Sequence, residues 1–347
     1  MKEKQLEMAL KDIWPQLPQG FAERSERQLA RLTAQKEERH MKKTGLLILA
    51  AALALAFTTA LAAGIISANT RRGLEENLNV DEDTKQHFEG TALFDEPNLS
   101  VSDNGVTVTL EECVVDSYAA YVAFRVQGYT PSDTSLQPDF DVVQYDFGVT
   151  GHSGSSAFNN WSRNEGGAYR ENYYDENGEL LYIIQLMSLD ETLPGKTARV
   201  EFRDLGVIRK KADVTVEVNG TWTFEWKLKG TEECAEKQLN APIGDSAATL
   251  THVLITPVHI EVSYEAPELR FDEDGFALSP TEFCGFTLDD GSTYRFAYDS
   301  GFFGYTTEGG VEFTQKNALT KVIRPESVTE IIFFITESGE YVNVSVQ

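Results

Sequence analysis

A long stretch without charge is the feature that most constrains this chain. Between Lys43 and Arg71 lie 27 consecutive uncharged residues, 44–70, dominated by leucine, alanine and isoleucine. A helix needs about 20 apolar residues to cross the hydrocarbon core of a bilayer. The sequence therefore predicts a single transmembrane helix over residues 44–70.

Two other interpretations of this stretch fit it less well. Ala60-Leu61-Ala62 matches a signal-peptidase cleavage pattern, but a signal peptide has an apolar region of only about 7–15 residues close to the N-terminus. Here 43 residues come before the apolar stretch. A buried core helix of a soluble protein seldom lacks charge over such a length. We therefore favour a retained span.

The basic residues on either side of this stretch predict its orientation. Lysine and arginine near a span are retained on the cytoplasmic side. Residues 24–43 hold seven of them and residues 71–90 hold three. This difference predicts a cytoplasmic N-terminus and an extracellular location for residues 71–347. The membrane-flanking cations are Arg39, Lys42, Lys43, Arg71 and Arg72.

The net charge divides at the same boundary. The formal charge of −25 is the sum of +3 on residues 1–43 and −28 on residues 71–347. So acidic a chain lacks the clustered cations that bind nucleic acid. A basic cytoplasmic segment favours anionic membrane lipid, and an acidic exterior favours solubility.

Residues 1–43 are predicted to form a cytoplasmic stub of two short helices. Pro15 and Pro18 separate them, because proline lacks an amide donor and disfavours helix in the residue before it. Forty-three residues with few large apolar side chains cannot build an independent core. Docking on a cytoplasmic partner and lying on lipid headgroups both remain open. The candidate partner-binding residues are Leu10, Trp14, Phe21, Leu29 and Leu32.

Beyond the span, the sequence changes to a strand pattern. Residues 71–90 are polar and acidic and predict a tether. From about residue 91 apolar and polar residues alternate, most clearly over 222–228, which is typical of half-buried antiparallel strands. Hairpin turns that need positive φ are predicted at five dipeptides: Asn104-Gly105, Asn177-Gly178, Asn219-Gly220, Asp274-Gly275 and Asp290-Gly291.

Many short strands without a long amphipathic helix predict a mainly β fold built from two tandem immunoglobulin-like β-sandwiches. We place them at residues 91–230 and 239–347, with a polar segment, residues 229–238, between them. Predicted strands of the first are 106–115, 119–127, 145–149, 182–187, 198–202, 214–218 and 221–228. Those of the second are 249–255, 259–264, 282–288, 293–298, 311–314, 320–323, 330–335 and 341–346.

Four sequence patterns resemble those of a known family. They are the stub pattern Leu17-Pro18, Phe21, Arg24, Leu29 and Leu32, then VTVTLEECVVD at 106–116, YAAYVAFRV at 118–126, and the strand pair within 250–264. Together they resemble bacterial single-pass membrane proteins with an extracellular domain of unknown function 4179, followed by a second immunoglobulin-like module. The resemblance implies an anti-sigma-factor-like role in envelope signalling, with a cytoplasmic sigma factor as partner. One departure is that His40 has no cysteines beside it, so the His-x3-Cys-x2-Cys zinc set of one anti-sigma fold is absent.

No catalytic motif stands out in the sequence. The five histidines lie outside HExxH and nucleophile-elbow patterns. His252 and His259 are seven residues apart, yet no third metal ligand is suggested, so ordinary sheet histidines are favoured over a metal site. The acidic loops at 175–178, 272–275 and 289–291 fit hairpin turns better than calcium loops. The sequence therefore predicts no catalytic residue, metal site or cofactor, and no enzyme.

Three cysteines lie in the predicted exterior, so at most one intramolecular disulfide can form. Cys113 and Cys284 fall in strand patterns and are expected to be buried as small hydrophobic side chains. Cys234 lies in the polar segment between the sandwiches, and a bridge from it to Cys284 is only weakly suggested.

Two functions fit these observations. The first is a membrane-anchored regulatory or sensing protein that binds a cytoplasmic regulator through its stub and an unknown ligand outside. The alternative is an extracellular binding or structural module that a single span merely anchors, without a signalling role.

Overall fold

The structure is a computed structural model. It describes residue 74 and residues 78–133, 136–158, 179–210, 213–268, 270–271, 277–296, 301–307 and 310–347. The predicted stub and the predicted span at 44–70 lie outside the described residues. Within the described part of the chain, none of the helices combines the length and the apolar character needed to cross a bilayer.

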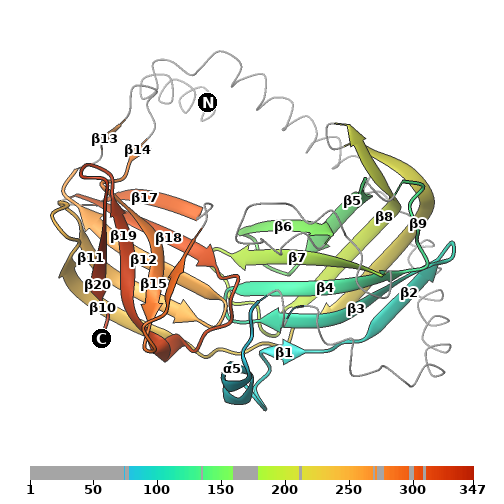
Figure 1. Ribbon diagram of the computed structural model, residues 1–347, viewed down its shortest axis with the longest axis horizontal. Coiled ribbons are helices and arrows are strands. Elements are labelled where there is room, and N and C mark those ends of the chain that lie inside the picture. Colours follow the sequence, from blue (N-terminus) through green and yellow to red (C-terminus); the bar gives the residue numbers. More distant parts are fainter. Residues whose placement is uncertain are drawn as a thin grey trace, which may run out of the picture. The chain divides into compact units, whose positions relative to one another are not determined.

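The described chain is mainly β, as the sequence predicted, and every strand pairing is antiparallel (Figure 1). A six-stranded sheet has the order β1-β3-β4-β7-β6, with β2 paired to β3, and a three-stranded sheet has the order β5-β8-β9. We call these two sheets the first sheet pair. Its strands are β1 Phe94–Asp95, β2 Leu99–Asp103, β3 Val106–Val115, β4 Ala119–Gln127, β5 Gln137–Asp146, β6 His152–Phe158, β7 Leu180–Ser188, β8 Thr197–Lys210 and β9 Asp213–Lys227.

One hydrophobic core draws side chains from both sheets of the first pair. Phe124 of β4 packs edge to face against Phe202 of β8, with ring centroids 4.9 Å apart. Phe140 of β5 stacks on Phe202 at 4.5 Å, and Trp222 of β9 is fully buried beside Phe140. The two sheets thus bury their facing sides against each other, which is the main source of stability for such a layer.

A second pair of sheets follows in the chain. A five-stranded sheet has the order β10-β11-β12-β18-β17, and a four-stranded sheet has the order β16-β15-β19-β20. We call these the second sheet pair, and they share a separate core. Its strands are β10 Ala235–Pro242, β11 Thr249–Thr256, β12 His259–Ala266, β15 Thr281–Leu288, β16 Thr293–Arg295, β17 Gly301–Thr307, β18 Gly310–Ala318, β19 Val328–Ile335 and β20 Glu340–Ser345. A short ladder pairs β13 Arg270–Phe271 with β14 Ala277–Leu278, and a 3-10 helix, η2, spans Pro325–Ser327.

Several predicted strands and turns are confirmed. The strands at 106–115 and 119–127 have the predicted bounds. Asn104 and Gly105 have φ values of 47° and 82° and form the tight turn between β2 and β3. A two-residue turn of this kind needs positive φ at both positions, which is why asparagine followed by glycine predicts it well.

The hairpin predicted at Asn219-Gly220 is wrong, because both residues lie inside the continuous strand β9. Here the glycine serves close packing: a Cβ on Gly220 would lie 2.5 Å from the buried ring of Trp222. The amide of Gly220 donates to the Asp204 carboxylate at 3.0 Å, where the β8–β9 register shifts. Glycine within a strand commonly marks such an irregularity.

Two further predictions fail around the second sheet pair. The segment predicted as a polar connection up to residue 238 includes the start of strand β10, whose pairing with β11 begins at Ala235. The strand predicted at 320–323 is absent. Instead, the amides of Val322 and Ile323 donate to the carbonyls of Leu78 and Pro257, each at 3.0 Å.

The segment predicted as a tether is folded over its described part. Helix α5 spans Glu82–His87, and the Asp81 carboxylate caps it by accepting a bond from the Thr84 amide at 2.7 Å. Leu78 and Phe88 on either side of α5 are 1% and 2% exposed. The acidic composition of this segment predicts a tether, but the buried side chains of Leu78 and Phe88 pack it against the sheets.

Candidate functional site

The residues that the sequence singled out for partner binding and membrane flanking all lie outside the described residues. They are Leu10, Trp14, Phe21, Leu29, Leu32, Arg39, Lys42, Lys43, Arg71 and Arg72. Among the described residues, the side chains of a candidate site lie where the chain that precedes β1 meets both sheet pairs. We call the described residues from Leu74 to Leu93 the entry segment.

The entry segment is held by both sheet pairs. Leu74, Leu78, Phe88 and Leu93 are buried in a third hydrophobic cluster. The other members of this cluster come from β3, β4 and β7 and from the turns of the second sheet pair, and they are Val114, Ala119, Tyr121, Ala123, Leu181, Ile183, Val258 and Val322. Backbone bonds accompany this packing, because the amide of Val115 donates to the carbonyl of Leu93 at 3.0 Å and that of Val322 to Leu78.

A buried carboxylate joins the two sheet pairs directly. Asp116 follows β3 and is 0% exposed. One of its oxygens accepts from the amides of Tyr118 and Ala119 at 2.8 and 2.7 Å. The other accepts from the amide of Val258 at 2.8 Å and from the hydroxyl of Thr256. Burial raises the pKa of Asp116, whereas these four hydrogen bonds oppose the rise.

A buried histidine begins strand β12, next to the turn residue Val258 that bonds this carboxylate. His259 is 0% exposed, and neither ring nitrogen has a hydrogen-bond partner among the described residues. Its ring centroid is 5.4 Å from that of Tyr118. Burial, followed by repulsion from Lys316, lowers the pKa of His259 to about 3, so the ring is neutral at ordinary pH.

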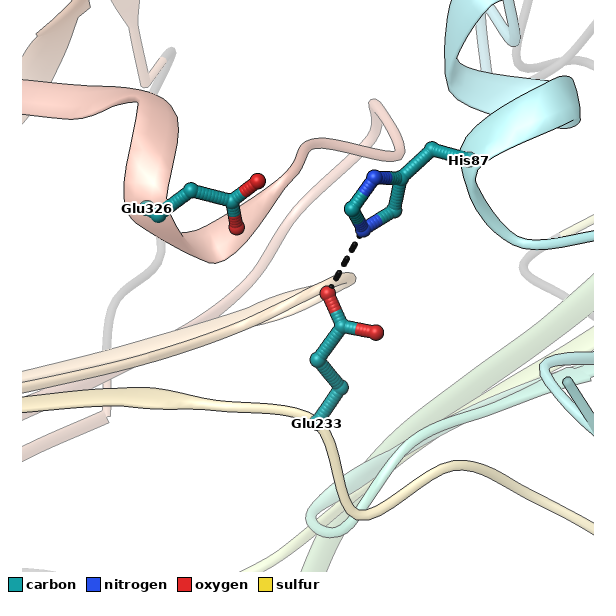
Figure 2. A group of neighbouring side chains, drawn as sticks. All are labelled: His87, Glu233 and Glu326. Atoms are coloured by element: carbon teal, nitrogen blue, oxygen red, sulfur yellow. Dashed lines mark hydrogen bonds and ion pairs between the residues drawn. The ribbon is translucent and has the colours of Figure 1, made fainter.

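Three side chains of types that can bind a metal converge near this junction (Figure 2). His87 comes from the last turn of α5, Glu233 from the connection between β9 and β10, and Glu326 from η2. The Nε2 atom of His87 lies 2.8 Å from Oε1 of Glu233. One ligand atom from each of the three residues lies within 4.8 Å of the other two. Imidazole and carboxylate together form a typical ligand set for a divalent transition metal.

Two cavities open on the described part of the chain. One of about 200 Å³ adjoins α5 and η2 and is lined by both signs of charge: Asp81, Asp83, Asp289, Asp290, Lys321 and Arg324. A larger cavity of about 550 Å³ carries the carboxylates of Asp245, Glu268 and Glu337, and its lining includes no histidine from the described residues.

His252 and His259, which are seven residues apart in the sequence, do not lie opposite each other in the sheet. In the β11–β12 register, His252 lies opposite Ser263, whereas His259 lies opposite Thr256. His252 instead contacts Glu236, with Nε2 and Oε1 3.0 Å apart. Asp290-Gly291 forms the turn between β15 and β16, with φ of 81° at Gly291, as expected for a turn.

The cysteines are all free. Cys113 is buried, as predicted, and burial raises the pKa of its thiol. Cys284 is half-buried rather than buried, and Cys234 is exposed.

Sequence reasoning missed the cluster of His87, Glu233 and Glu326. His87 and Glu233 are 146 residues apart in the sequence, and Glu326 follows later still, in η2 after strand β18. Local spacing carries no signal for such a set, because its members meet only after the sheets have packed.

Comparison with known proteins adds a likeness in structure alone. No family model and no curated protein matches the chain. Among solved structures, it is similar to the crystal structure of a conserved domain protein from Bacillus anthracis, with 13% sequence identity and a TM-score of 0.45. The likeness covers 80% of this chain and 96% of that one. It bears on neither activity nor site.

Proposed function

We propose that this chain is a membrane-anchored envelope regulatory or sensing protein, similar to anti-sigma factors. Its cytoplasmic stub binds a regulator such as a sigma factor, and its extracellular sheets bind an unknown ligand. The uncharged stretch at 44–70 and the excess of lysine and arginine before it support this topology.

The extracellular part is proposed to be two tandem immunoglobulin-like sandwiches. Two separate cores, each shared by two antiparallel sheets, support this arrangement. In this interpretation the first sheet pair and the second sheet pair are one sandwich each.

The observation that carries the regulatory role is the packing of the entry segment. A protein that is merely anchored needs only a free linker between its span and its folded part. Here the chain that follows the predicted span is buried against both sheet pairs through Leu74, Leu78 and Phe88. A change in how the sheet pairs meet would therefore alter the contacts of the segment that leads to the span.

A capture experiment with the full chain tests the role of the stub. A photo-crosslinking residue at Trp14 or Leu29, in cells of the natural host, is expected to trap a sigma factor. The matched control scrambles residues 5–33 and keeps residues 36–43 with their lysines and arginine, so that membrane insertion is preserved. Recovery of no sigma factor or other transcription regulator with the native stub would contradict the proposal and favour the anchored-module alternative.

A further inference from the structure

We propose that His87, Glu233 and Glu326 bind one divalent transition-metal ion, represented by zinc, and that the bound ion fastens the entry segment to the second sheet pair. This inference does not depend on the proposed function.

The ligand types select the class of metal. One imidazole nitrogen and two carboxylate oxygens match the donors that zinc takes in proteins, with water completing the coordination. Calcium and magnesium prefer ligand sets made only of oxygen, so an imidazole disfavours them.

The spacing is close to that of a loaded site. Ligand atoms bound to one tetrahedral zinc ion at about 2.0–2.2 Å lie about 3.3–3.6 Å apart. The three ligand atoms here lie within 4.8 Å of one another. The side chains of His87 and Glu233 are 32% and 33% exposed and that of Glu326 is exposed, so rotations about their side-chain bonds can bring the three atoms to the zinc spacing.

The backbones that carry the three ligands are held in place. His87 ends the capped helix α5, next to the buried ring of Phe88. The amide of Glu233 donates to the hydroxyl of Thr231 at 3.2 Å. The hydroxyl of Ser327, next to Glu326, donates to the carbonyl of Arg324 at 2.7 Å. The site is therefore largely formed before the ion binds.

The two carboxylates of the cluster repel each other, and this repulsion favours binding of a cation. Two carboxylates lie near one imidazole, and the Glu233 carboxylate contacts the His87 ring at 2.8 Å. The Glu326 carboxylate makes no hydrogen bond or ion pair with the residues that the structure describes. A divalent ion among the three groups would offset the repulsion between the two carboxylates.

A titration with zinc alone tests the site. The full chain is purified in detergent without a polyhistidine tag, freed of metal with a chelator, and titrated with zinc chloride by calorimetry. We expect one zinc ion at this cluster, and a loss of affinity of about tenfold or more in both H87A and E326Q. The matched control is H252A, which breaks the His252–Glu236 pair, another exposed histidine–glutamate contact, and should leave zinc binding unchanged.

Two results of the titration would overturn the site. One is the absence of zinc binding by the unsubstituted chain. The other is zinc binding that keeps its stoichiometry and affinity in both H87A and E326Q, which would place the ion elsewhere. X-ray absorption should show only nitrogen and oxygen ligands, and a sulfur ligand that disappears in C234S would contradict the ligand set.

Hydrogen exchange tests the fastening. Zinc should slow amide exchange across residues 82–93 in the unsubstituted chain but not in E326Q. Bound zinc that leaves exchange in these residues unchanged would overturn the proposed fastening.

Discussion

At the scale of single residues, Asp116 is the most consequential side chain at the junction of the sheet pairs. Its two oxygens accept four hydrogen bonds, one of them from Thr256 at the end of β11 and one from Val258 in the turn that follows. Removing an acceptor leaves buried donors unpaired, which costs more than the hydrogen bond itself contributes.

Asp116→Ala is therefore expected to lower the free energy of unfolding by about 2–4 kcal/mol. Urea denaturation of the full chain in detergent, followed by tryptophan fluorescence, measures this. The control Asp190→Ala changes an exposed aspartate and should have little effect. A loss in Asp116→Ala no larger than in the control would contradict this role.

His259 predicts a specific dependence of stability on pH. Its folded-state pKa of about 3 lies below its ordinary value near 6.5. As pH falls below 6.5, the unfolded chain gains a proton that the folded chain does not take up. This contribution to stability is therefore present at neutral pH and is lost as pH falls from about 6.5 toward 3, by up to about 1.4 kcal/mol per pH unit.

His259→Leu should remove that contribution while filling a similar volume. Between pH 7 and pH 5 the free energy of unfolding of the unsubstituted chain should fall by about 2 kcal/mol more than that of the variant. Urea denaturation at the two pH values measures the change. Parallel losses in both proteins would show that His259 takes up its proton as readily in the folded state.

At the scale of elements, strand β9 shows what sequence can and cannot predict. The alternation of Trp222, Phe224 and Trp226 with polar residues predicts this strand, and all three side chains are buried as expected. The Asn219-Gly220 pair predicts a turn because both residues tolerate positive φ. Yet Gly220 meets a packing need that only the fold reveals, namely the approach of the Trp222 ring.

Gly220→Ala is expected to destabilise the chain by about 1–3 kcal/mol, because the added methyl group would overlap that ring. Thermal unfolding in detergent measures the cost. Asn219→Ala is the matched control, since its backbone carbonyl can still accept from the Asn104 side chain. Equal stability of Gly220→Ala and the control would contradict the packing explanation.

Strand β10 escaped prediction for a different reason. Its residues alternate between exposed and half-buried, with none fully buried, as fits a strand at the edge of the five-stranded sheet. Its apolar signal is correspondingly weak. The His87, Glu233 and Glu326 cluster escaped because its members come from three separate segments. The mainly β fold and the strands with strong alternation were predictable from sequence, whereas edge strands and sites assembled by packing were not.

At the scale of the whole described body, the two sheet pairs are coupled through buried and partly buried polar contacts. Besides the Asp116 bonds, the hydroxyl of Tyr121 on β4 donates to the carbonyl of Leu319 at 2.7 Å. Lys316 of β18, which pairs at 2.9 Å with the carboxylate of Glu261 in the same sheet, also donates to the carbonyl of Leu189 after β7. Such contacts favour unfolding of both sheet pairs in one step.

Calorimetry of the full chain in detergent should therefore give one main unfolding transition for the body. The double variant Asp116→Ala with Tyr121→Phe should separate it into two transitions, one for each core. Two transitions already present in the unsubstituted chain would show that the junction does not couple the sheet pairs.

Hydrogen exchange of the full chain in lipid nanodiscs, without added metal, tests the central claim most directly. The claim is that the entry segment is docked on both sheet pairs and is not a free linker. We expect the amides of Phe88 and Val322, which are bonded to Thr84 and Leu78, to be protected to a degree approaching that of β3 and β4. Residues 78–93 that exchange as fast as a free loop, while β3 and β4 remain protected, would contradict the claim.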